Sequence, residues 1–476
     1  MTHAPPRLTT AGRIVLLGLL ALAAAACDDE SAKSGVDLGP EVAADAGGDG
    51  MRAQFGDAAR DASSDAMMDA TVDGIDAMVD GGAEKAFDPA RLIEVRVEIA
   101  PADWDALRVE GRSWGEVLRP DCQDAPSPSP YHWYHGTVTV DGEVFGDVAV
   151  RKKGFLGSLS ATRPSLKIKL DEYVPDQAFR GLDRLTLNNG RQDPSAIRTC
   201  LAYSMFARAG VPTPRCSMAH VTVNGVDLGV YAHVEAVKKP FLRAHFNDDE
   251  GWLYEGNLSD FRDGWTDTFE QKTREDVPYR APLDRVVAAL DAPDETLFAA
   301  LDAVLDLDAF FTFWATEVLI AHWDGYAGDL NNFLVYADAE TERLRFIPWG
   351  PDAAFEPPRL LTEGVPAPRS VFAVGALARR LYLHPEGRAR FLARLRTLHD
   401  TLWDVPGLQA EAEAWGAVAA QAVPEAARAR HAIAVAEVGA FIAEQDAAVT
   451  ADLDAGGVDW VLPLRGPICV QPAGDA

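Results

Sequence analysis

The alternation of apolar and polar residues predicts two β-hairpins and one further strand. An Asp-Gly pair at 141–142 breaks the apolar run over 136–150, and an Asn-Gly pair at 224–225 breaks the run over 219–234. Both pairs are favoured in two-residue hairpin turns because they accept positive φ. The segment 166–170 alternates strictly, with leucine and isoleucine on one face and lysine on the other. Period-two alternation indicates a half-buried strand, so this part of the chain is predicted to form β-sheet.

Helix signals alternate with these strands. Asp193 suits the N-cap of a helix, Pro194 its first position and Gly210 its end. A longer apolar helix is predicted over 307–323, and a further pair of short strands within 333–347. Strands and helices mixed in this way predict an α+β core.

The pattern changes again in the last quarter of the chain. From about residue 371 it is typical of Ala-rich amphipathic helices, the longest of them predicted near 424–447. We therefore divide the folded chain into a core over 86–360 and a helical C-terminal part of the same domain over 361–476.

The N-terminus has the pattern of a secretory signal. Residues 1–27 contain two arginines and no acid, and 14–26 are apolar apart from one glycine. This run is too short to span a bilayer, which takes about 20 residues. Three alanines lead into Cys27 as in a bacterial lipobox, although Ala24 stands where leucine is usual. We expect a lipoprotein signal peptide with Cys27 lipidated; the alternative is ordinary cleavage nearby with Cys27 incidental.

The negative charge is divided between a segment near the N-terminus and the folded region. The 476 residues are 48% hydrophobic and carry a formal net charge of −29. Residues 28–85 have few aromatics and a charge of −11, so we expect a disordered acidic tether. A charge of −20 remains on 86–476. This acidity argues against nucleic acid or an anionic membrane surface as the main partner.

An exported chain can form disulfides, and four cysteines besides Cys27 allow three pairings. Cys122 lies in a Pro/Ser-rich loop and Cys469 near the C-terminus, so a bridge between them would hold loose chain. We expect the pairs Cys122–Cys469 and Cys200–Cys216.

One candidate for anion binding is the turn that follows the first hairpin. The common signatures G-x-S-x-G, H-E-x-x-H, Walker A and G-x-G-x-x-G are absent from the sequence. A predicted strand instead delivers basic residues to a glycine-serine turn, whose backbone amides can approach a phosphate. The candidate residues are Arg151, Lys153, Gly154 and Ser158. The alternative is an ordinary exposed turn.

Lys167 and Glu235 are candidates beside this turn. A lysine on a sheet face near a glycine turn can hold nucleotide phosphates, although Lys167 and Lys169 also suit a solvated strand face. Glu235 closes an otherwise apolar strand, where it could pair with Lys167 or help hold a metal. The alternative is that the strand reaches water there.

Three oxygen-bearing side chains follow the long apolar helix. Asp324 stands after its C-terminus, where the macrodipole disfavours negative charge, which suggests a cation or a proton-transfer task rather than a turn alone. Asn332 enters one predicted strand and Asp352 follows the next. A hairpin would bring the three together, and they form the oxygen set that phosphoryl transfer with Mg²⁺ requires.

At these residues the sequence resembles the CotH family, which is named for a spore-coat protein and contains atypical, kinase-like protein kinases. The resemblance covers about 91–360, in the family's order. It rests on FRGLDRLTLNN at 179–189, DPS at 193–195, RTCLAY at 198–203, GVPTPR at 210–215, the Asn-Gly turn, GVY at 229–231, Glu235, GWLY at 251–254, the 324–332 stretch and IPW at 347–349.

The resemblance implies an α+β fold with an atypical protein-kinase-like core and a mixed or antiparallel sheet. It implies that Lys167 contacts ATP phosphates, that Asp324 is the catalytic aspartate, and that Asn332 and Asp352 hold Mg²⁺ or Mn²⁺. In the family an aspartate commonly follows the Pro-Trp pair directly, whereas here that position is Gly350. The nearest acid, Asp352, matches a Trp-Gly-x-Asp form, and this departure bears on catalysis rather than fold.

The resemblance and the leader together imply an exported, membrane-anchored kinase, periplasmic or on the cell surface, that phosphorylates Ser or Thr of secreted or envelope proteins. A catalytically inactive surface protein that binds or scaffolds is the alternative, favoured by Gly350 and by the scarcity of ATP outside the inner membrane. Metal-assisted phosphate hydrolysis would use the same carboxylates, but no sequence feature selects it. The expected partners are a nucleotide, an envelope protein and, through the lipid anchor only, the membrane, with no nucleic acid.

Overall fold

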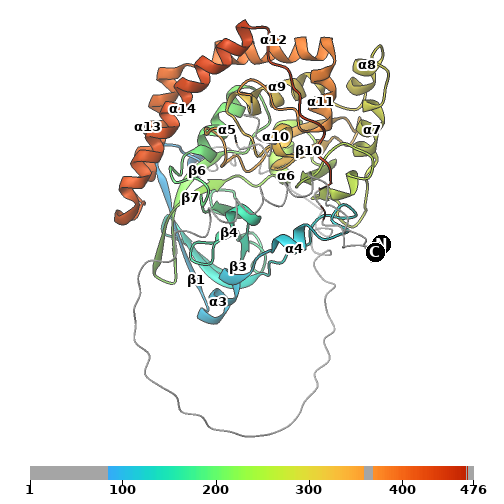
Figure 1. Cartoon of the computed structure of the whole chain (residues 1–476). Coiled ribbons are helices and arrows are strands. Elements are labelled where there is room, and N and C mark those ends of the chain that lie inside the picture. Colours follow the sequence, from blue (N-terminus) through green and yellow to red (C-terminus); the bar gives the residue numbers. More distant parts are fainter. Residues whose placement is uncertain (1–83, 359–367, 468, 470–476) are drawn as a thin grey trace, which may run out of the picture. The chain divides into compact units, whose positions relative to one another are not determined.

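Seven strands close into a barrel in the first half of the described chain (Figure 1). The computed structural model describes residues 84–358, 368–467 and 469. The order around the barrel is β1-β2-β3-β4-β5-β7-β6, in which β1 and β6 are parallel and the other neighbours antiparallel. The strands are β1 (Leu92–Ile99), β2 (Tyr134–Val140), β3 (Glu143–Lys153), β4 (Ser165–Lys169), β5 (Arg184–Asn188), β6 (Cys216–Val223) and β7 (Val226–Val234).

Alternating side chains of these strands form the barrel core. On β4, Leu166 and Ile168 are fully buried in it, and Lys167 lies on the opposite face of the strand. The turns at 141–142 and 224–225 close β2–β3 and β6–β7, and all four of their residues have positive φ. Both hairpins and the strand predicted from the sequence are therefore confirmed.

A second, four-stranded antiparallel sheet follows the barrel. Its order is β11-β10-β8-β9, so the predicted strand pair β10–β11 is confirmed and is extended by two strands that the pattern did not indicate. The strand β9 has only two residues, too few for any periodicity to be visible. The strands are β8 (Trp252–Gly256), β9 (Glu270–Gln271), β10 (Phe333–Ala337) and β11 (Leu344–Pro348).

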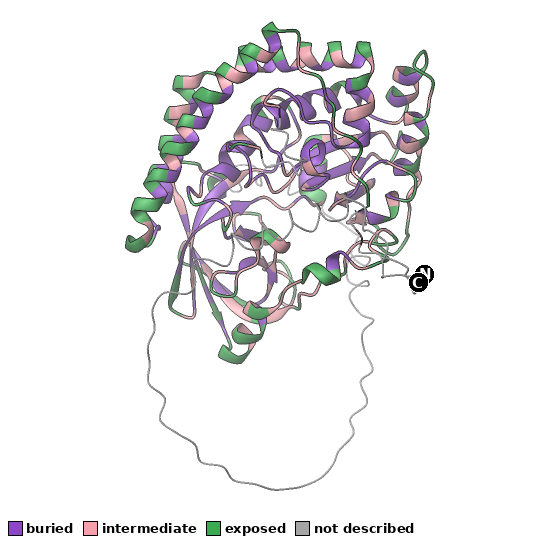
Figure 2. Cartoon of the chain, viewed as in Figure 1, coloured by how far each residue is buried: buried purple, intermediate pink, exposed green. Residues whose placement is uncertain are grey.

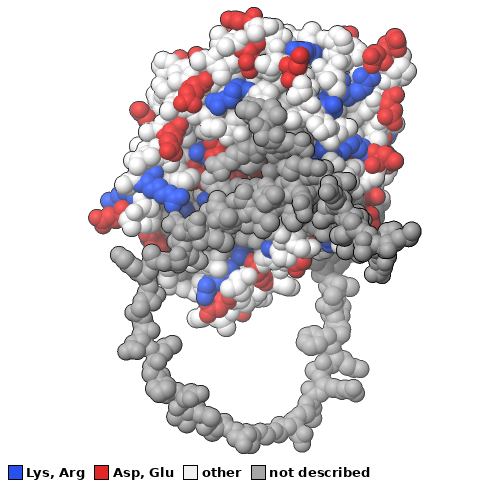
Figure 3. All heavy atoms as spheres, in the orientation of Figure 1, with Lys and Arg blue, Asp and Glu red and all other residues white. Residues whose placement is uncertain are grey.

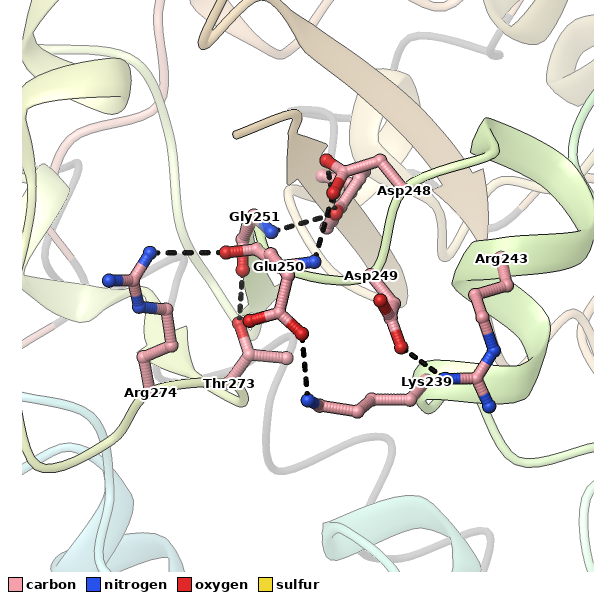
Figure 4. Close-up of polar contacts among 9 residues, drawn as sticks. Lys239, Arg243, Asp248, Asp249, Glu250, Gly251, Thr273 and Arg274 are labelled. Atoms are coloured by element: carbon pink, nitrogen blue, oxygen red, sulfur yellow. Dashed lines mark hydrogen bonds and ion pairs between the residues drawn. The ribbon is translucent and has the colours of Figure 1, made fainter. Parts of the chain in front are cut away.

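An acidic loop fixes the start of β8 (Figure 4). Asp248 accepts hydrogen bonds from the backbone of Glu250 at 3.0 Å and from two groups on and after β10. Asp249 pairs with Arg243 at 2.5 Å, and Glu250 pairs with Lys239 at 3.0 Å, both on α6 (Lys239–Phe246). The three acids are thus engaged in holding α6 and β8 in place.

The helix after β5 begins later than the sequence pattern predicts. α5 spans Arg198–Arg208, whereas we expected Asp193 and Pro194 to start it. Residues 193–197 instead form a turn in which Asp193 accepts from the amide of Ser195 at 3.0 Å and from that of Arg198 at 2.8 Å. Asp193 therefore still satisfies a free amide at the helix start, but from a position five residues earlier.

Helices occupy most of the chain after β11, as Figure 1 shows, and a mixed α+β architecture is confirmed. Their buried faces join one core cluster with α5 and α9 (Figure 2). Trp314 of α9 stacks on Phe391 with ring centroids 3.9 Å apart, and buried Gln445 donates to the carbonyl of Val318 at 3.2 Å. The helices not yet given are α3 (Pro101–Val109), α4 (Trp114–Val117), α7 (Ala281–Leu290), α8 (Leu297–Asp302), α9 (Leu307–Leu319), α10 (Tyr326–Asp329), α11 (Ala376–Leu383), α12 (Pro385–Leu402), α13 (Val405–Ala419) and α14 (Arg428–Asp454).

Two disulfides join parts of the described chain. They link Cys122 to Cys469 and Cys200 to Cys216, with Cα atoms 5.5 Å and 5.2 Å apart. These are the pairs expected from the sequence. The first joins positions 347 residues apart, so it ties the segment after α4 to the C-terminal tail.

The predicted leader with Cys27, and nearly all of the predicted tether, lie outside the described residues. None of the helices in the described ranges has the length and apolar content needed to cross a membrane. On the face seen in Figure 3, acidic and basic side chains of the described residues are interspersed.

Candidate active site

Asp324 lies in the loop after α9, and two asparagines hold its carboxylate. Asn332 Nδ2 donates to Oδ2 at 2.7 Å, and Asn331 Nδ2 donates to Oδ1 at 3.2 Å. Burial, followed by the nearby charges of Asp329 and Asp352, raises the pKa of Asp324 well above its usual range. The carboxylate is therefore oriented by neutral donors and is sensitive to any cation placed nearby.

A buried glutamate fixes the backbone of this loop. Glu317 of α9 accepts hydrogen bonds from the amides of Tyr326 and Ala327, each at 3.0 Å. Burial raises the pKa of Glu317 to about 8. A Cβ at Gly325 would overlap the Glu317 carboxylate, so the approach requires glycine. Glu317 thus sets the path of the loop that carries Asp324, although nothing in the sequence pattern set it apart from other helix residues.

Gly350 and Asp352 follow β11, opposite this loop. Gly350 has a φ of +52°, and a Cβ there would lie 3.0 Å from Asn332 Oδ1, so a larger residue would be strained and would crowd that side chain. Burial and the charge of Asp193 raise the pKa of Asp352 to about 6, against the opposing effects of Lys153 and Arg198. Asn332 is hydrogen-bonded to Asp324, and Asp352 lies near enough for its charge to raise the pKa of that carboxylate, so the structure places the three residues near one another.

Lys153 connects the barrel to this acidic cluster. Its ammonium, at the end of β3, donates to Asn188 Oδ1 and lies 5.6 Å from the ring centroid of Trp349. Burial lowers the pKa of Lys153 to about 8, and the charges of Glu255 and Asp352 oppose that shift. Of the basic residues predicted from the turn, Lys153 is the one electrostatically coupled to Asp352.

Lys167 lies on the neighbouring strand, in register opposite Arg151. Burial and then Arg151, with other basic neighbours, lower the pKa of Lys167 well below its usual range. No hydrogen bond or ion pair joins its ammonium to another described residue. Its charge nevertheless helps to lower the pKa of Glu255. Arg151 stacks its guanidinium on Trp133, 4.7 Å from the ring centroid. A buried ammonium in a basic environment is a suitable place for an anion.

The glycine turn after β3 is closed by its own serine. Ser158 Oγ accepts from the amide of Phe155 at 3.1 Å and donates to its carbonyl at 3.1 Å. Gly154 has a φ of +127°, and its carbonyl accepts from Tyr131 Oη at 2.6 Å. A Cβ at Gly154 would lie 2.6 Å from Ser158 Oγ, so only glycine permits this closure. Ser158 therefore shapes the turn through its hydroxyl.

Glu235 is placed differently from our expectation. Its carboxylate pairs with Arg215, with Oε1 2.6 Å from Nη2, and not with Lys167. The acid near Lys153 and Lys167 is Glu255 of β8, whose Oε2 lies 3.0 Å from Lys272 Nζ. Sequence reasoning missed Glu255 because β8 pairs with β10, far along the chain, and a short apolar strand gives no indication of which residues it faces.

The oxygen donors of the cluster suit a hard divalent cation. Mg²⁺ is commonly bound through one or two carboxylates together with substrate phosphates. Asn332 uses its Nδ2 on Asp324, which leaves its Oδ1 available as a ligand. Within the described ranges, no three His, Cys, Asp or Glu side chains are grouped closely enough to hold a metal by themselves. A metal at this cluster would therefore need further ligands, such as the oxygens of a bound phosphate.

The fold and site define a class of protein: an α+β chain in which the lysine at the end of a barrel strand lies close to a carboxylate-amide cluster. The family model described as CotH kinase protein matches residues 150–448. This match covers more than half of the chain, and the chain belongs to the CotH family.

Individual relatives cover smaller parts. The chain is similar to inner spore coat protein H of Bacillus subtilis, with 26% identity over 194 residues, which are 38% of this chain and 52% of that protein. It is similar to invasin CotH7 of Rhizopus delemar, with 24% identity over 225 residues, 43% of this chain and 37% of the invasin. The chain thus spans about half, or less, of the curated relatives it matches.

Proposed function

We propose that the protein is an ATP- and Mg²⁺- or Mn²⁺-dependent kinase that phosphorylates Ser or Thr of secreted or envelope proteins. It acts from a membrane anchor at lipidated Cys27, outside the cytoplasm, and does not use nucleic acid as a partner. The observation that carries the proposal is the grouping of Asp324, Asn332 and Asp352 near Lys153. Membership of a family described as kinase supports it.

Each group has a distinct task in this proposal. Lys153 and Lys167, with Arg151 and the turn that contains Gly154 and Ser158, hold nucleotide phosphates by charge and backbone donors. Asp352 and Asn332 hold the metal, which when bound neutralises charge on the phosphates.

Asp324 acts on the acceptor. Its carboxylate orients the Ser or Thr hydroxyl and takes its proton as the oxygen attacks the γ-phosphorus of ATP. The bond between that phosphorus and the bridging oxygen breaks, and ADP leaves. Asn331 and Asn332 each donate to a different oxygen of Asp324, so the carboxylate is held in place and takes the proton on a lone pair that the asparagines leave unused.

One observation favours a second candidate function, binding or scaffolding without catalysis. The position that follows Pro348 and Trp349 is Gly350, where a Cβ would crowd Asn332 Oδ1. A CotH-like surface protein that binds or scaffolds without catalysis would retain the same fold, and Asp324 and Asp352 would then serve only local structure.

The two functions predict different responses to nucleotide. Thermal unfolding of the full chain is measured with ATP alone, with Mg²⁺ or Mn²⁺ alone and with both, and labelled phosphate is followed into the chain itself and into a casein-like acceptor. The kinase proposal expects stabilisation only with nucleotide and metal together, and transfer that Asp324→Ala and Asp352→Ala abolish. A scaffold expects no response to nucleotide.

A control variant distinguishes the effect of losing a carboxylate at the site from the effect of losing negative charge elsewhere. Asp308→Asn removes an exposed carboxylate of α9 that pairs with Arg394 and should leave transfer unchanged. Transfer that survives in both Asp324→Ala and Asp352→Ala would refute these assignments.

A further inference from the structure

A small cavity lies beside the glycine turn, and the acidic cluster does not line it. Its volume is about 40 Å³, and three stretches of chain form its wall: residues 112–127 around α4, Phe155 of the turn, and residues 257–270, which run from the end of β8 to the first residue of β9. A buried water needs about 10–15 Å³ of such volume, so the space holds about three waters or one tetrahedral oxyanion.

Three residues of the wall contribute buried donors without a partner. These are Arg112 Nε, Arg119 Nη1 and Gln123 Nε2, none of which has a hydrogen-bond acceptor among the described residues. Leaving buried donors unpaired is unfavourable, and charged donors most of all. Their gathering at one cavity indicates a ligand that supplies acceptor oxygens.

The charge of the wall favours an anion. Arg112 stacks over Phe155, 5.2 Å from the ring centroid, and within the described chain no carboxylate lies at ion-pair distance from it. Arg119 is held by Asp121 through Nε at 3.1 Å and by the Ala125 carbonyl through Nη2 at 3.1 Å, so its geometry is set while Nη1 stays unused.

One carboxylate also lines the cavity. It belongs to Glu270, whose Oε1 lies 2.9 Å from Lys272 Nζ, an ammonium that also pairs with Glu255, so the charge of Glu270 is compensated in part. Two guanidinium groups, those of Arg112 and Arg119, thus line the cavity against one partly compensated carboxylate.

We infer that this cavity binds a single phosphoryl group, either free phosphate or the phosphate monoester of a modified side chain. Guanidinium groups bind such oxyanions through paired N–H donors, and Gln123 adds an amide donor. The site is separate from the proposed catalytic centre, because Asp324, Asn332, Asp352 and Lys153 are not among the residues that form it. It would let the protein retain or sense a phosphorylated group beside the nucleotide turn.

The inference is tested without ATP or metal, so its failure is distinguishable from failure of the proposed kinase activity. Inorganic phosphate and a phosphoserine peptide are titrated into the full chain by calorimetry, with the unphosphorylated peptide for comparison. We expect saturable binding of phosphate that weakens about tenfold or more in Arg112→Gln and in Arg119→Gln. The control Arg396→Gln removes an exposed guanidinium paired with Asp454 and should bind as the wild type does.

A variant that binds phosphate more tightly shows that the changes in affinity do not come from misfolding. Glu270→Gln removes the carboxylate of the wall and should strengthen phosphate binding several-fold, which misfolding cannot imitate. A peptide that binds more tightly than free phosphate identifies a modified side chain as the ligand, and equal affinities identify phosphate itself. No saturable binding of either probe, or binding that is unchanged in Arg112→Gln and Arg119→Gln, would overturn the inference.

Discussion

Asn332 Nδ2 donates to Asp324 Oδ2 at 2.7 Å, while the Oδ1 of the same asparagine lies against Gly350. One amide thus joins the loop after α9 to the residue that follows β11. Its left-handed backbone, with a φ of +49°, directs the side chain in this way at the entry to β10. The relationship makes Asn332 the link between the proposed base and the proposed metal site.

The first prediction separates the two tasks of Asn332. Asn332→Gly keeps the left-handed backbone but removes both the donor to Asp324 and the proposed metal ligand. Asn331→Gly removes only a donor, at 3.2 Å. We expect phosphate transfer to fall about 100-fold or more in Asn332→Gly and about tenfold or less in Asn331→Gly.

The measurement is transfer at varied Mg²⁺, together with unfolding of each variant. Raising Mg²⁺ should partly restore Asn332→Gly and leave Asn331→Gly unaffected. Equal losses in both variants, with the same metal dependence, would mean that Asn332 only orients Asp324.

Local patterns predicted much of the fold. The turns at 141–142 and 224–225 were visible because hairpin turns have strong residue preferences, and both hairpins are present. The start of α5 was placed wrongly because Asp193 and Pro194 suit both a helix start and the turn that precedes one. Closure of the barrel by parallel pairing of β1 with β6 depends on contacts far apart in sequence, which periodicity does not indicate.

The site was predictable to a similar degree. The sequence order placed Asp324, Asn332 and Asp352 at the ends of elements that a hairpin joins, and the structure brings them together. The partner of Glu235 was not predictable, because Arg215, just before β6, meets Glu235, just after β7, only when these strands pair, and the pattern favoured Lys167 or a metal. Which lysine approaches Asp352 depends on how the barrel packs against the second sheet. The alternation of apolar and polar residues carries no information on that packing.

The second prediction ranks the lysines. Lys153→Met should lower the apparent affinity for ATP more than Lys167→Met does, because Lys153 is the one whose charge acts on Asp352. Each loss should be about tenfold or more if the ammonium contacts phosphate. Lys169→Met is the matched control on β4, since Lys169 pairs with Glu172 at 2.6 Å. ATP titrations followed by thermal unfolding report the order, and an effect of Lys169→Met as large as the others would contradict it.

The third prediction concerns the position after Trp349. Gly350→Asp restores the residue common in the family, but its positive φ and the contact with Asn332 Oδ1 should displace Asn332. We expect a loss of stability of about 1–2 kcal/mol from the backbone conformation and a further fall in nucleotide-dependent stabilisation. Gly264→Asp is the control, because Gly264 also has a positive φ but lies in open space. A gain of transfer in Gly350→Asp would show that the acid at 350 was the missing group.

The fourth prediction is a pH dependence from Glu317. Its pKa is raised from 4.5 to about 8 by burial, so the folded state holds a proton that the unfolded state has released. The stability that Glu317 contributes is therefore complete below about pH 4.5 and is lost as the pH rises toward 8, by up to about 1.4 kcal/mol per pH unit. In Glu317→Gln this slope should disappear. The free energy of unfolding of the variant should therefore rise relative to that of the wild type between pH 6 and 8.5.

Denaturant unfolding of both proteins across that range gives the difference directly. Glu437→Gln, at an exposed position of α14, is the control, and its free energy of unfolding should differ from that of the wild type by the same amount at every pH. A constant difference between Glu317→Gln and the wild type would mean that Glu317 is ionised in the folded state even near pH 6.

The fifth prediction uses the two disulfides as a matched pair. The bridge between Cys122 and Cys469 closes 347 residues, and the bridge between Cys200 and Cys216 closes 16. Loop-closure entropy grows with the logarithm of loop length, so Cys122→Ser/Cys469→Ser should lose about 2–3 kcal/mol more than Cys200→Ser/Cys216→Ser. Because Cys122 also lines the cavity between Arg119 and Gln123, the first double variant alone should weaken phosphate binding. Equal weakening in both would mean that binding follows global stability and not the local hold on this wall.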